Sequence, residues 1–257
     1  MSQELFDMFR FIPVKGPLIY AATAAVTVVL SFVTLILVST YAETQINLSV
    51  EMIQFFNALV ALAGLTKCIL KRKDLLLPKI IFQSLICFVL GELYWVLHIY
   101  IRGYEQAGVF SISDISWLGF YFFLLAACRN VFHRNIDFKD NQYRKINIIS
   151  LFAPAFIIGI NMVLFLTGDS LFYTIIYTIP TAFLGYYTLR LVLTSFKNEI
   201  LKSFRTYHMT VGLILLLDNL ACLALNLGFE DAEYIFKFCF ALLLLLITPA
   251  VYKGVQK

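Results

Sequence analysis

The sequence predicts an all-α protein, a polytopic membrane helical bundle with about eight transmembrane helices. Of its 257 residues, 61% are hydrophobic and only 14% are charged, whereas about a quarter of the residues in a soluble domain are charged. All but two of the 20 Lys and Arg residues lie in five short patches between long apolar runs. Because about 20 apolar residues cross the hydrocarbon core, little of the chain is left outside the membrane. These observations exclude a soluble catalytic or nucleic-acid-binding domain.

Each long apolar run is read as one membrane span. Ahead of the first run, residues 1–16 mix apolar and charged side chains, which is typical of a short amphipathic helix lying at the membrane interface. The rest of the chain divides into two membrane units of four spans each, residues 17–133 and 134–257. The spans are expected at 17–41, 48–70, 78–102, 113–133, 146–167, 170–195, 204–226 and 231–253.

The basic patches alternate with acidic connections along the chain and predict the orientation. The patches lie at 10–15, 67–79, 129–145, 190–205 and 253–257. The positive-inside rule places all five in the cytoplasm, so both termini are expected to be cytoplasmic. The expected location is the inner or plasma membrane of a bacterium. The opposite loops are expected to carry Glu43, Glu51, Glu105, Asp114, Asp169, Glu230, Asp231 and Glu233.

Two stretches of the chain share a pattern that predicts an internal repeat. In each half a mid-span carboxylate, Glu92 or Asp218, precedes an outer loop. The next helix then begins near Asp114 or Asp231, with an aromatic residue three positions later. We expect both of these Asp residues to be helix N-caps. Since each half has four spans, the halves would form two parallel four-helix repeats related by an axis along the membrane normal.

Three charged residues fall inside the expected spans, namely Glu92, Asp218 and Lys237. Charges in the bilayer interior cost a few kcal/mol each and are functional candidates. All three are expected in the outer half of the membrane or near its midplane, where several other polar side chains share their depth. The predicted ligand-binding set is Glu92, Tyr94, His98, Asp114, Asn161, Tyr177, Asp218, Asn219 and Lys237.

Three interpretations of these charges are open. In the first, Glu92 and Asp218 are paired carboxylates in a polar pocket that opens outward, with Lys237 as their counter-ion. In the second, Lys237 forms a structural salt bridge with one of the two acids. In the third, Lys237 extends to the outer headgroups. The pocket is favoured because one bridge would leave a second acid in need of water, a proton or a ligand.

The sequence predicts neither a metal site nor a cofactor. Its three His residues are scattered, without HExxH or a similar pair, and no P-loop, GxGxxG or GxSxG motif occurs. The five Cys residues lie inside or at the ends of apolar runs, so we expect no disulfide framework. The N-terminus lacks the pattern of a cleaved signal peptide.

Residues 91–95 (Gly-Glu-Leu-Tyr-Trp) and 110–121 (Phe-Ser-Ile-Ser-Asp-Ile-Ser-Trp-Leu-Gly-Phe-Tyr) carry one resemblance. The chain resembles the multi-pass N-terminal membrane sensor module of bacterial PAS, GGDEF and histidine-kinase proteins. That module repeats the pattern near its end, as 217–218 and 231–234 do here, and Pro249 closes the last span. Glu92 stands where that family usually has Asp. The resemblance implies a sensor. Since the sequence ends at Lys257 without an output domain, the expectation is either a stand-alone sensor that signals through a partner protein or a different function.

The same residues are also similar, more distantly, to the lysoplasmalogenase family, which has eight spans with acids on the third and seventh. This similarity implies hydrolysis of the vinyl-ether bond of lysolipids and assigns the paired acids to Glu92 and Asp218. Two positions depart from that family. A His that is usual early in the fourth span is replaced around Asp114, and the start of the last span differs around Lys237.

The functional expectation is a membrane-embedded ligand-sensing or ligand-binding module. A small or lipidic ligand would enter from the outer side, and binding would be read by a cytoplasmic signalling partner. Membrane lipids are expected partners, and nucleic acid is not. The first alternative is a lysolipid hydrolase with Glu92 and Asp218 as catalytic acid and base. The second is a small-solute transporter built from parallel repeats.

Overall fold

The computed structural model describes residues 22, 24–30, 33, 43–71, 76–102, 111–135, 143–168 and 170–255. Within these residues the protein is all-α, as predicted. The expected interfacial segment 1–16 and most of the expected span 17–41 lie outside the described residues. The helices are α3 (Glu43–Lys71), α4 (Leu76–Arg102), α5 (Ile112–Asn135), α6 (Arg144–Ser150), α7 (Phe152–Thr167), α8 (Leu171–Thr194), α9 (Glu199–Asn226) and α10 (Glu230–Val255).

Six stretches of the described residues are long and apolar enough to cross a membrane. They identify an integral membrane protein with several membrane-spanning helices. α8 has 24 residues but is not among the six, because its Tyr and Thr residues make it less apolar. The six stretches are Leu48–Leu70, Leu76–Arg102, Ile112–Val131, Arg144–Thr167, Leu201–Asn226 and Glu230–Val255.

α6 and α7 together form one of these stretches. They are separated only by Leu151, which lies in a turn. Pro154 explains the interruption, because proline has no N–H to donate to the carbonyl of Ser150 four residues earlier. In the preceding turn, the Ser150 hydroxyl donates to the carbonyl of Ile146 at 2.7 Å.

The outer surface of the bundle is apolar, as expected of a surface that faces lipid. On α7, Phe152 and Leu166 expose three-quarters of their surface, and Phe156 and Met162 about half. A continuous apolar surface of this kind is unusual on a soluble monomer.

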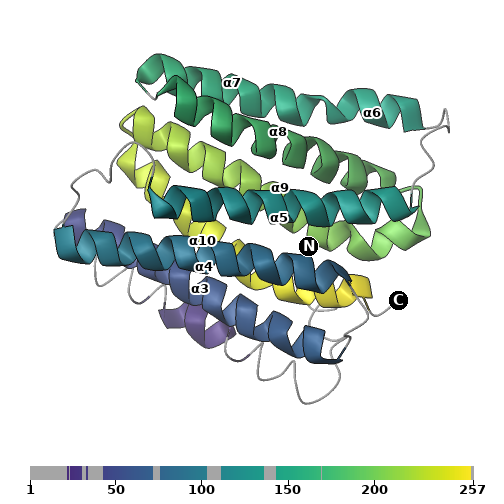
Figure 1. The fold of residues 1–257 in the computed structure, drawn as a ribbon, viewed down its shortest axis with the longest axis horizontal. Helices are drawn as coiled ribbons and strands as arrows, with labels where there is room; N and C mark the ends of the chain where they lie inside the picture. The colour runs from purple at the N-terminus through teal and green to yellow at the C-terminus, as the bar shows by residue number, and fades with distance from the viewer. Residues whose placement is uncertain are drawn as a thin grey trace.

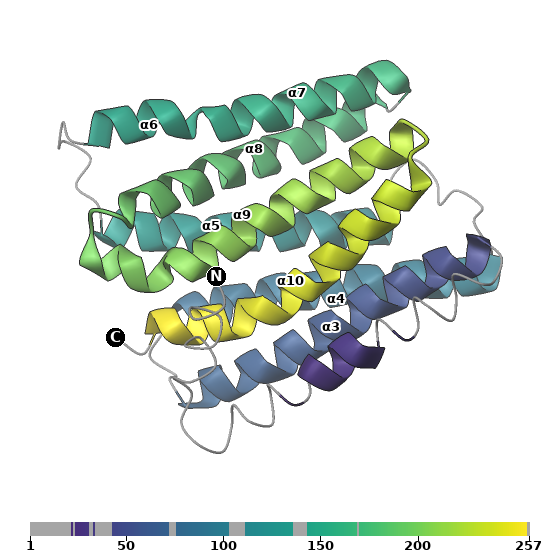
Figure 2. The same ribbon diagram turned by 180° about the vertical axis from the view of Figure 1, so that it is seen from behind.

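The helices are packed as a closed ring of six. α3 packs on α4, α4 on α5 and α5 on α8; then α8 packs on α9, α9 on α10 and α10 returns to α3. α7 lies outside this ring against α8 and α9, and Figures 1 and 2 show α6 and α7 along one edge of the molecule. The order of contacts is the same in both halves, with α8, α9 and α10 in the places of α3, α4 and α5. An internal duplication would produce this order, and the duplication itself stays a prediction.

Side-chain hydrogen bonds to backbone carbonyls join neighbouring helices of the ring. At the junction of α3 and α10, Asn57 Nδ2 donates to the carbonyl of Ala241 at 2.9 Å. Thr248 Oγ1 donates in the other direction, to the carbonyl of Ala61 at 2.7 Å. These bonds join segments far apart in the sequence and close the ring.

The two ends of the bundle differ in charge. The C-terminal ends of α4, α7 and α9 meet the N-terminal ends of α5, α8 and α10 at one end of the molecule (Figure 1). The other end carries most of the described basic residues. They include Lys79, Arg129, Arg144, Lys145, Lys197, Lys202, Arg205 and Lys253. We refer to it as the basic end, and the positive-inside rule predicts that it is cytoplasmic.

The structure corrects the two N-cap predictions. α5 begins at Ile112, so Ser111 occupies the cap position, and Asp114 Oδ2 accepts from the backbone N–H of Ser111 at 2.7 Å. This is the reciprocal partner of a capping box rather than the cap itself. Asp231 is the second residue of α10 and is exposed. Sequence proximity to a helix start does not fix the cap, because one or two residues change its role.

Candidate functional site

A cavity of about 360 Å³ lies among the ring helices and α7. The residues that line it occupy the half of the bundle away from the basic end, since they fall early in α3, α5, α8 and α10 and late in α4, α7 and α9. Its wall combines apolar and aromatic side chains with a polar set. The polar set includes Glu51, Gln54, Glu92, Asp114, Tyr121, Asn161, Tyr173, Tyr177, Asp218, Asn219, Asn226, Glu233 and Lys237.

Helical periodicity directs these side chains toward the cavity. On α4, Glu92 and Trp95 are three residues apart, and on α5, Trp117 and Tyr121 are four apart. Residues three and four apart share one face of a helix.

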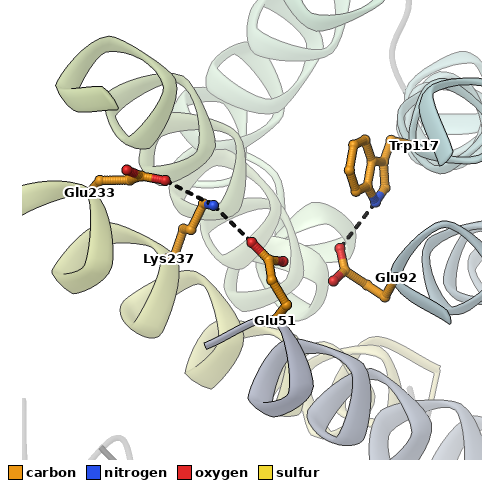
Figure 3. A network of polar contacts seen from close by, with 5 residues as sticks. All are labelled: Glu51, Glu92, Trp117, Glu233 and Lys237. Carbon is orange, nitrogen blue, oxygen red and sulfur yellow. Dashed lines mark hydrogen bonds and ion pairs between the residues drawn. The ribbon is translucent and has the colours of Figure 1, made fainter. Parts of the chain in front are cut away.

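Lys237 of α10 is the only cation among the residues that line the cavity. Its Nζ lies 2.8 Å from Glu51 Oε1 of α3 and 2.9 Å from Glu233 Oε1, one turn earlier on α10. Both acids are buried, with 5% and 3% of their surface exposed. Figure 3 shows Nζ between the two carboxyl groups. Lys237 therefore bridges two helices and faces the interior.

This arrangement changes two sequence-based expectations. We expected Lys237 to pair with Glu92 or Asp218, but its ion pairs are with Glu51 and Glu233. We also expected Glu51 and Glu233 in outer loops, whereas both lie in helices and are buried. The physical reason is that both acids lie in the first turns of membrane-spanning helices, and the neighbouring helices enclose those turns.

Glu92 of α4 is buried, with 2% of its surface exposed, and only half of its carboxyl group is satisfied. Its Oε1 accepts a hydrogen bond from Trp117 Nε1 of α5 at 3.0 Å. Its Oε2 has no hydrogen-bond partner among the described residues. The carboxyl groups of Glu92 and Glu51 point toward one another in Figure 3. Because an unpaired buried oxygen is rare in native proteins, a proton or a ligand donor is expected between the two facing carboxyl groups.

Asp218 of α9 is held by a tyrosine. The hydroxyl group of Tyr121 on α5 donates a hydrogen bond to Asp218 Oδ2. Nearby, the hydroxyl of Tyr177 on α8 lies 3.3 Å from both Asp114 Oδ1 and the Asp114 carbonyl. Asp114 thus completes the capping box of α5 and also links α5 to α8, so its carboxyl group has a structural role at the edge of the cavity.

Two asparagines form another wall of the cavity. Asn161 Nδ2 of α7 donates to the carbonyl of Ile157 at 2.8 Å and lies 3.3 Å from Asn219 Oδ1 of α9. Asn219 Nδ2 in turn donates to the carbonyl of Leu215 at 2.8 Å. The pair connects α7 to the ring through the bond between the two amide groups.

The structure brings seven of the nine predicted ligand-binding residues to this cavity and leaves two outside it. The two are Tyr94 and His98, which stack on each other at a centroid distance of 6.1 Å. His98 also stacks on Trp95, which does line the cavity, at 5.6 Å. Tyr94 follows Glu92 by two residues and so points to a different side of α4. The seven are Glu92, Asp114, Asn161, Tyr177, Asp218, Asn219 and Lys237.

Among the lining residues that were not predicted as ligand-binding, four make or adjoin the polar contacts described above: Glu51, Trp117, Tyr121 and Glu233. The sequence contains signals for three of them. Glu233 precedes Lys237 by four residues, the spacing of a helical ion pair. Trp117 and Tyr121 lie three and seven residues after Asp114, on one helix face. Glu51 has no such local signal, because its partner Lys237 lies 186 residues away.

The cavity has a strong excess of acidic groups. Five carboxyl side chains line it against the single ammonium group of Lys237. Within the residues that the structure describes, no three His, Cys, Asp or Glu side chains are grouped so that they could hold a metal ion. The acidic lining is therefore not arranged as a metal site in that part of the chain.

Gly91 keeps Trp117 in place, and its replacement is a test of the site. A Cβ at Gly91 would lie 2.8 Å from Cδ1 and Nε1 of the indole, so the ring must move. We expect Gly91→Ala to weaken the bond to Glu92 and to destabilise the fold by about 1–3 kcal/mol, typical of overpacking. Both Trp residues of the chain, Trp95 and Trp117, line the cavity. Intrinsic fluorescence should therefore report the change as a shifted emission maximum and a lower unfolding temperature.

Gly159→Ala on α7 is the matched control. A Cβ at Gly159 has no described neighbour within 4 Å, so its effect should be close to neutral. Equal effects of the two variants would show that the contact of Gly91 with Trp117 is not constraining.

Comparison with protein-family models, with curated proteins and with solved structures finds no match to this chain.

Proposed function

We propose that this protein is a ligand-binding module of the membrane, whose cavity takes a small or lipidic molecule from the side opposite the basic end. The observation that carries the proposal is the 360 Å³ cavity itself, with the unpaired Oε2 of Glu92 in its wall. Small-molecule sites have volumes of about 300–1,000 Å³ and place a few polar groups on an apolar and aromatic lining. A ligand that donates a hydrogen bond to Glu92 would account for the unpaired oxygen.

The cavity reaches the helix ends on the side from which a ligand would enter. Tyr173 is the third residue of α8, Asn226 is the last residue of α9, and both line the cavity. Leu225, also in the lining, is 54% exposed. With the basic end in the cytoplasm, as the positive-inside rule predicts, this opening faces the outer side.

The continuity of the helices supports a sensing role. α4, α5, α9 and α10 each contribute residues to the cavity and run without interruption to the basic end. A ligand that changes their packing around Glu92 and Asp218 would therefore alter their spacing at the basic end, where a cytoplasmic partner could read it. A ligand shifts such an equilibrium only by its difference in affinity for the two arrangements.

A lysolipid hydrolase is the second candidate, favoured by one specific observation. Glu92 and Asp218, the pair that the lysoplasmalogenase resemblance singles out, line the same cavity. They would act as catalytic acid and base on a vinyl-ether bond. The transporter alternative has less support. α8 and α10 are continuous helices through Pro180 and Pro249, so neither is a broken helix of the kind that forms many transporter sites.

Mass spectrometry separates the first two candidates. The purified protein in lipid nanodiscs is incubated with a panel of lysolipids that includes vinyl-ether lysolipids, and substrate, product and bound molecules are followed. A retained and unconverted molecule supports the binding module. Aldehyde release that disappears in Asp218→Asn establishes the hydrolase and overturns the binding proposal. Asp231→Asn is the matched control, because Asp231 is an exposed acid outside the cavity.

A further inference from the structure

We propose that the cavity selects an organic cation, a protonated amine or quaternary ammonium group attached to an apolar body. This inference rests on the proposed binding function and names the chemical class of the ligand. Three features of the cavity support it: the charge of its lining, the unsatisfied carboxyl group of Glu92 and its aromatic walls.

The lining of the cavity contains more acidic than basic side chains. The ammonium group of Lys237 is already engaged by Glu51 and Glu233. The carboxyl groups of Glu92 and Asp218 have no ion-pair partner among the described residues, and each is held by one neutral donor, Trp117 or Tyr121. Charges interact more strongly in the low-dielectric interior of a membrane protein than in water. A cationic ligand would therefore be favoured there, and an anionic one would be repelled.

The two carboxyl oxygens of Glu92 differ in their contacts. Its Oε1 is fixed by the Trp117 indole at 3.0 Å, while its buried Oε2 lacks a described partner. Glu51 points toward the same space (Figure 3). An N–H group of an ammonium ligand would supply a charge-assisted hydrogen bond to that oxygen, the stronger class of such bonds.

Aromatic side chains form two groups in the wall of the cavity. Phe88 stands between Phe120 and Phe240, with centroid distances of 5.0 and 5.5 Å, and all three line the cavity. Tyr173 and Tyr177 stack at 5.4 Å on α8 and also line it. Such rings accommodate an apolar body and attract an ammonium group through their faces. Together with the absence of a metal-binding group among the described residues, they favour an organic cation over an inorganic one.

Three probes of one shape test the inference: phenethylammonium, 2-phenylethanol and phenylacetate, which are cationic, neutral and anionic. Binding to the protein in nanodiscs is followed by tryptophan fluorescence, since Trp95 and Trp117 both line the cavity. We expect phenethylammonium to bind at least about tenfold more tightly than 2-phenylethanol, and phenylacetate to bind more weakly than either. Glu92→Gln should remove the tenfold preference while leaving 2-phenylethanol unchanged, and Asp231→Asn should keep it.

Equal affinity for the three probes, or tighter binding of phenylacetate, overturns the cation inference but leaves the binding function standing. Absence of binding by all three also overturns the inference, and the lysolipid experiment then decides the binding function separately. A response to Na⁺ or Ca²⁺ at constant ionic strength, without one to phenethylammonium, replaces the organic cation by an inorganic one. If Glu92→Gln does not fold, the order of the three affinities in the unmodified protein decides alone.

Discussion

Lys237→Met is expected to lower the free energy of unfolding by up to about 3–5 kcal/mol, the cost of removing one partner from a buried ion pair, because both acids are buried although the lysine is partly exposed. The substitution leaves Glu51 and Glu233 buried without the ammonium group that both contact, at 2.8 and 2.9 Å. Methionine keeps much of the volume and apolar character of the lysine stem, so the change isolates the charge. The measurement is denaturant-induced unfolding in nanodiscs, followed by tryptophan fluorescence.

The control is the triple variant in which Glu51→Gln and Glu233→Gln accompany Lys237→Met. It removes the unpaired charges, so most of the lost stability should return. Asp231→Asn removes an exposed charge from the same turn as Glu233 and should have little effect. If Lys237→Met alone is as stable as the unmodified protein, the ion-paired arrangement of Lys237 is wrong and the side chain reaches solvent or headgroups instead.

Glu92→Gln and Asp218→Asn are each expected to reduce ligand affinity by at least about tenfold, since hydrogen bonds to charged groups contribute about 1.5–3 kcal/mol. Both carboxyl groups line the same cavity, so both should matter for one ligand. The measurement is titration with the molecule retained in the lysolipid experiment or with phenethylammonium. Tyr121→Phe keeps the Asp218 carboxyl group and removes only its described hydrogen bond, so its effect should be smaller.

A contrary result would separate the two acids. If Asp218→Asn leaves both stability and binding unchanged while Glu92→Gln abolishes binding, Asp218 does not belong to the ligand site. The cavity would then be used only on the side of α3, α4 and α10, around Glu51 and Glu92.

Part of the site could be predicted because charges within apolar runs are visible in a sequence. Glu92, Asp218 and Lys237 were selected on that ground alone, and the structure places all three at one cavity. The prediction failed for the partners of Lys237. Glu51 and Glu233 lie close to the ends of apolar runs, where a sequence does not distinguish a loop from the enclosed first turns of a helix.

The pairing of α3 with α10 could not be predicted either. Asn57 and Ala241, joined by one hydrogen bond, are 184 residues apart. The local sequence of α3 does not show that its partner is α10, because the helix surfaces that contact other helices and those that contact lipid are both apolar. Elsewhere in the ring α4 and α5 pack closely at Gly119, where a Cβ would lie 3.0 Å from Cys87 Sγ.

The sequence by itself determined that this is an all-α protein with several membrane-spanning helices. Its apolar runs are long enough to cross the bilayer, and a backbone surrounded by lipid must satisfy its hydrogen bonds within the helix. It also determined which charges are unusual. Only the tertiary structure decided what those charges face. In the ring of helices, Glu92 and Asp218 face the same cavity. Lys237 forms its ion pairs with Glu51 and Glu233. Such choices depend on contacts between residues far apart in the chain, and these form only when the helices pack.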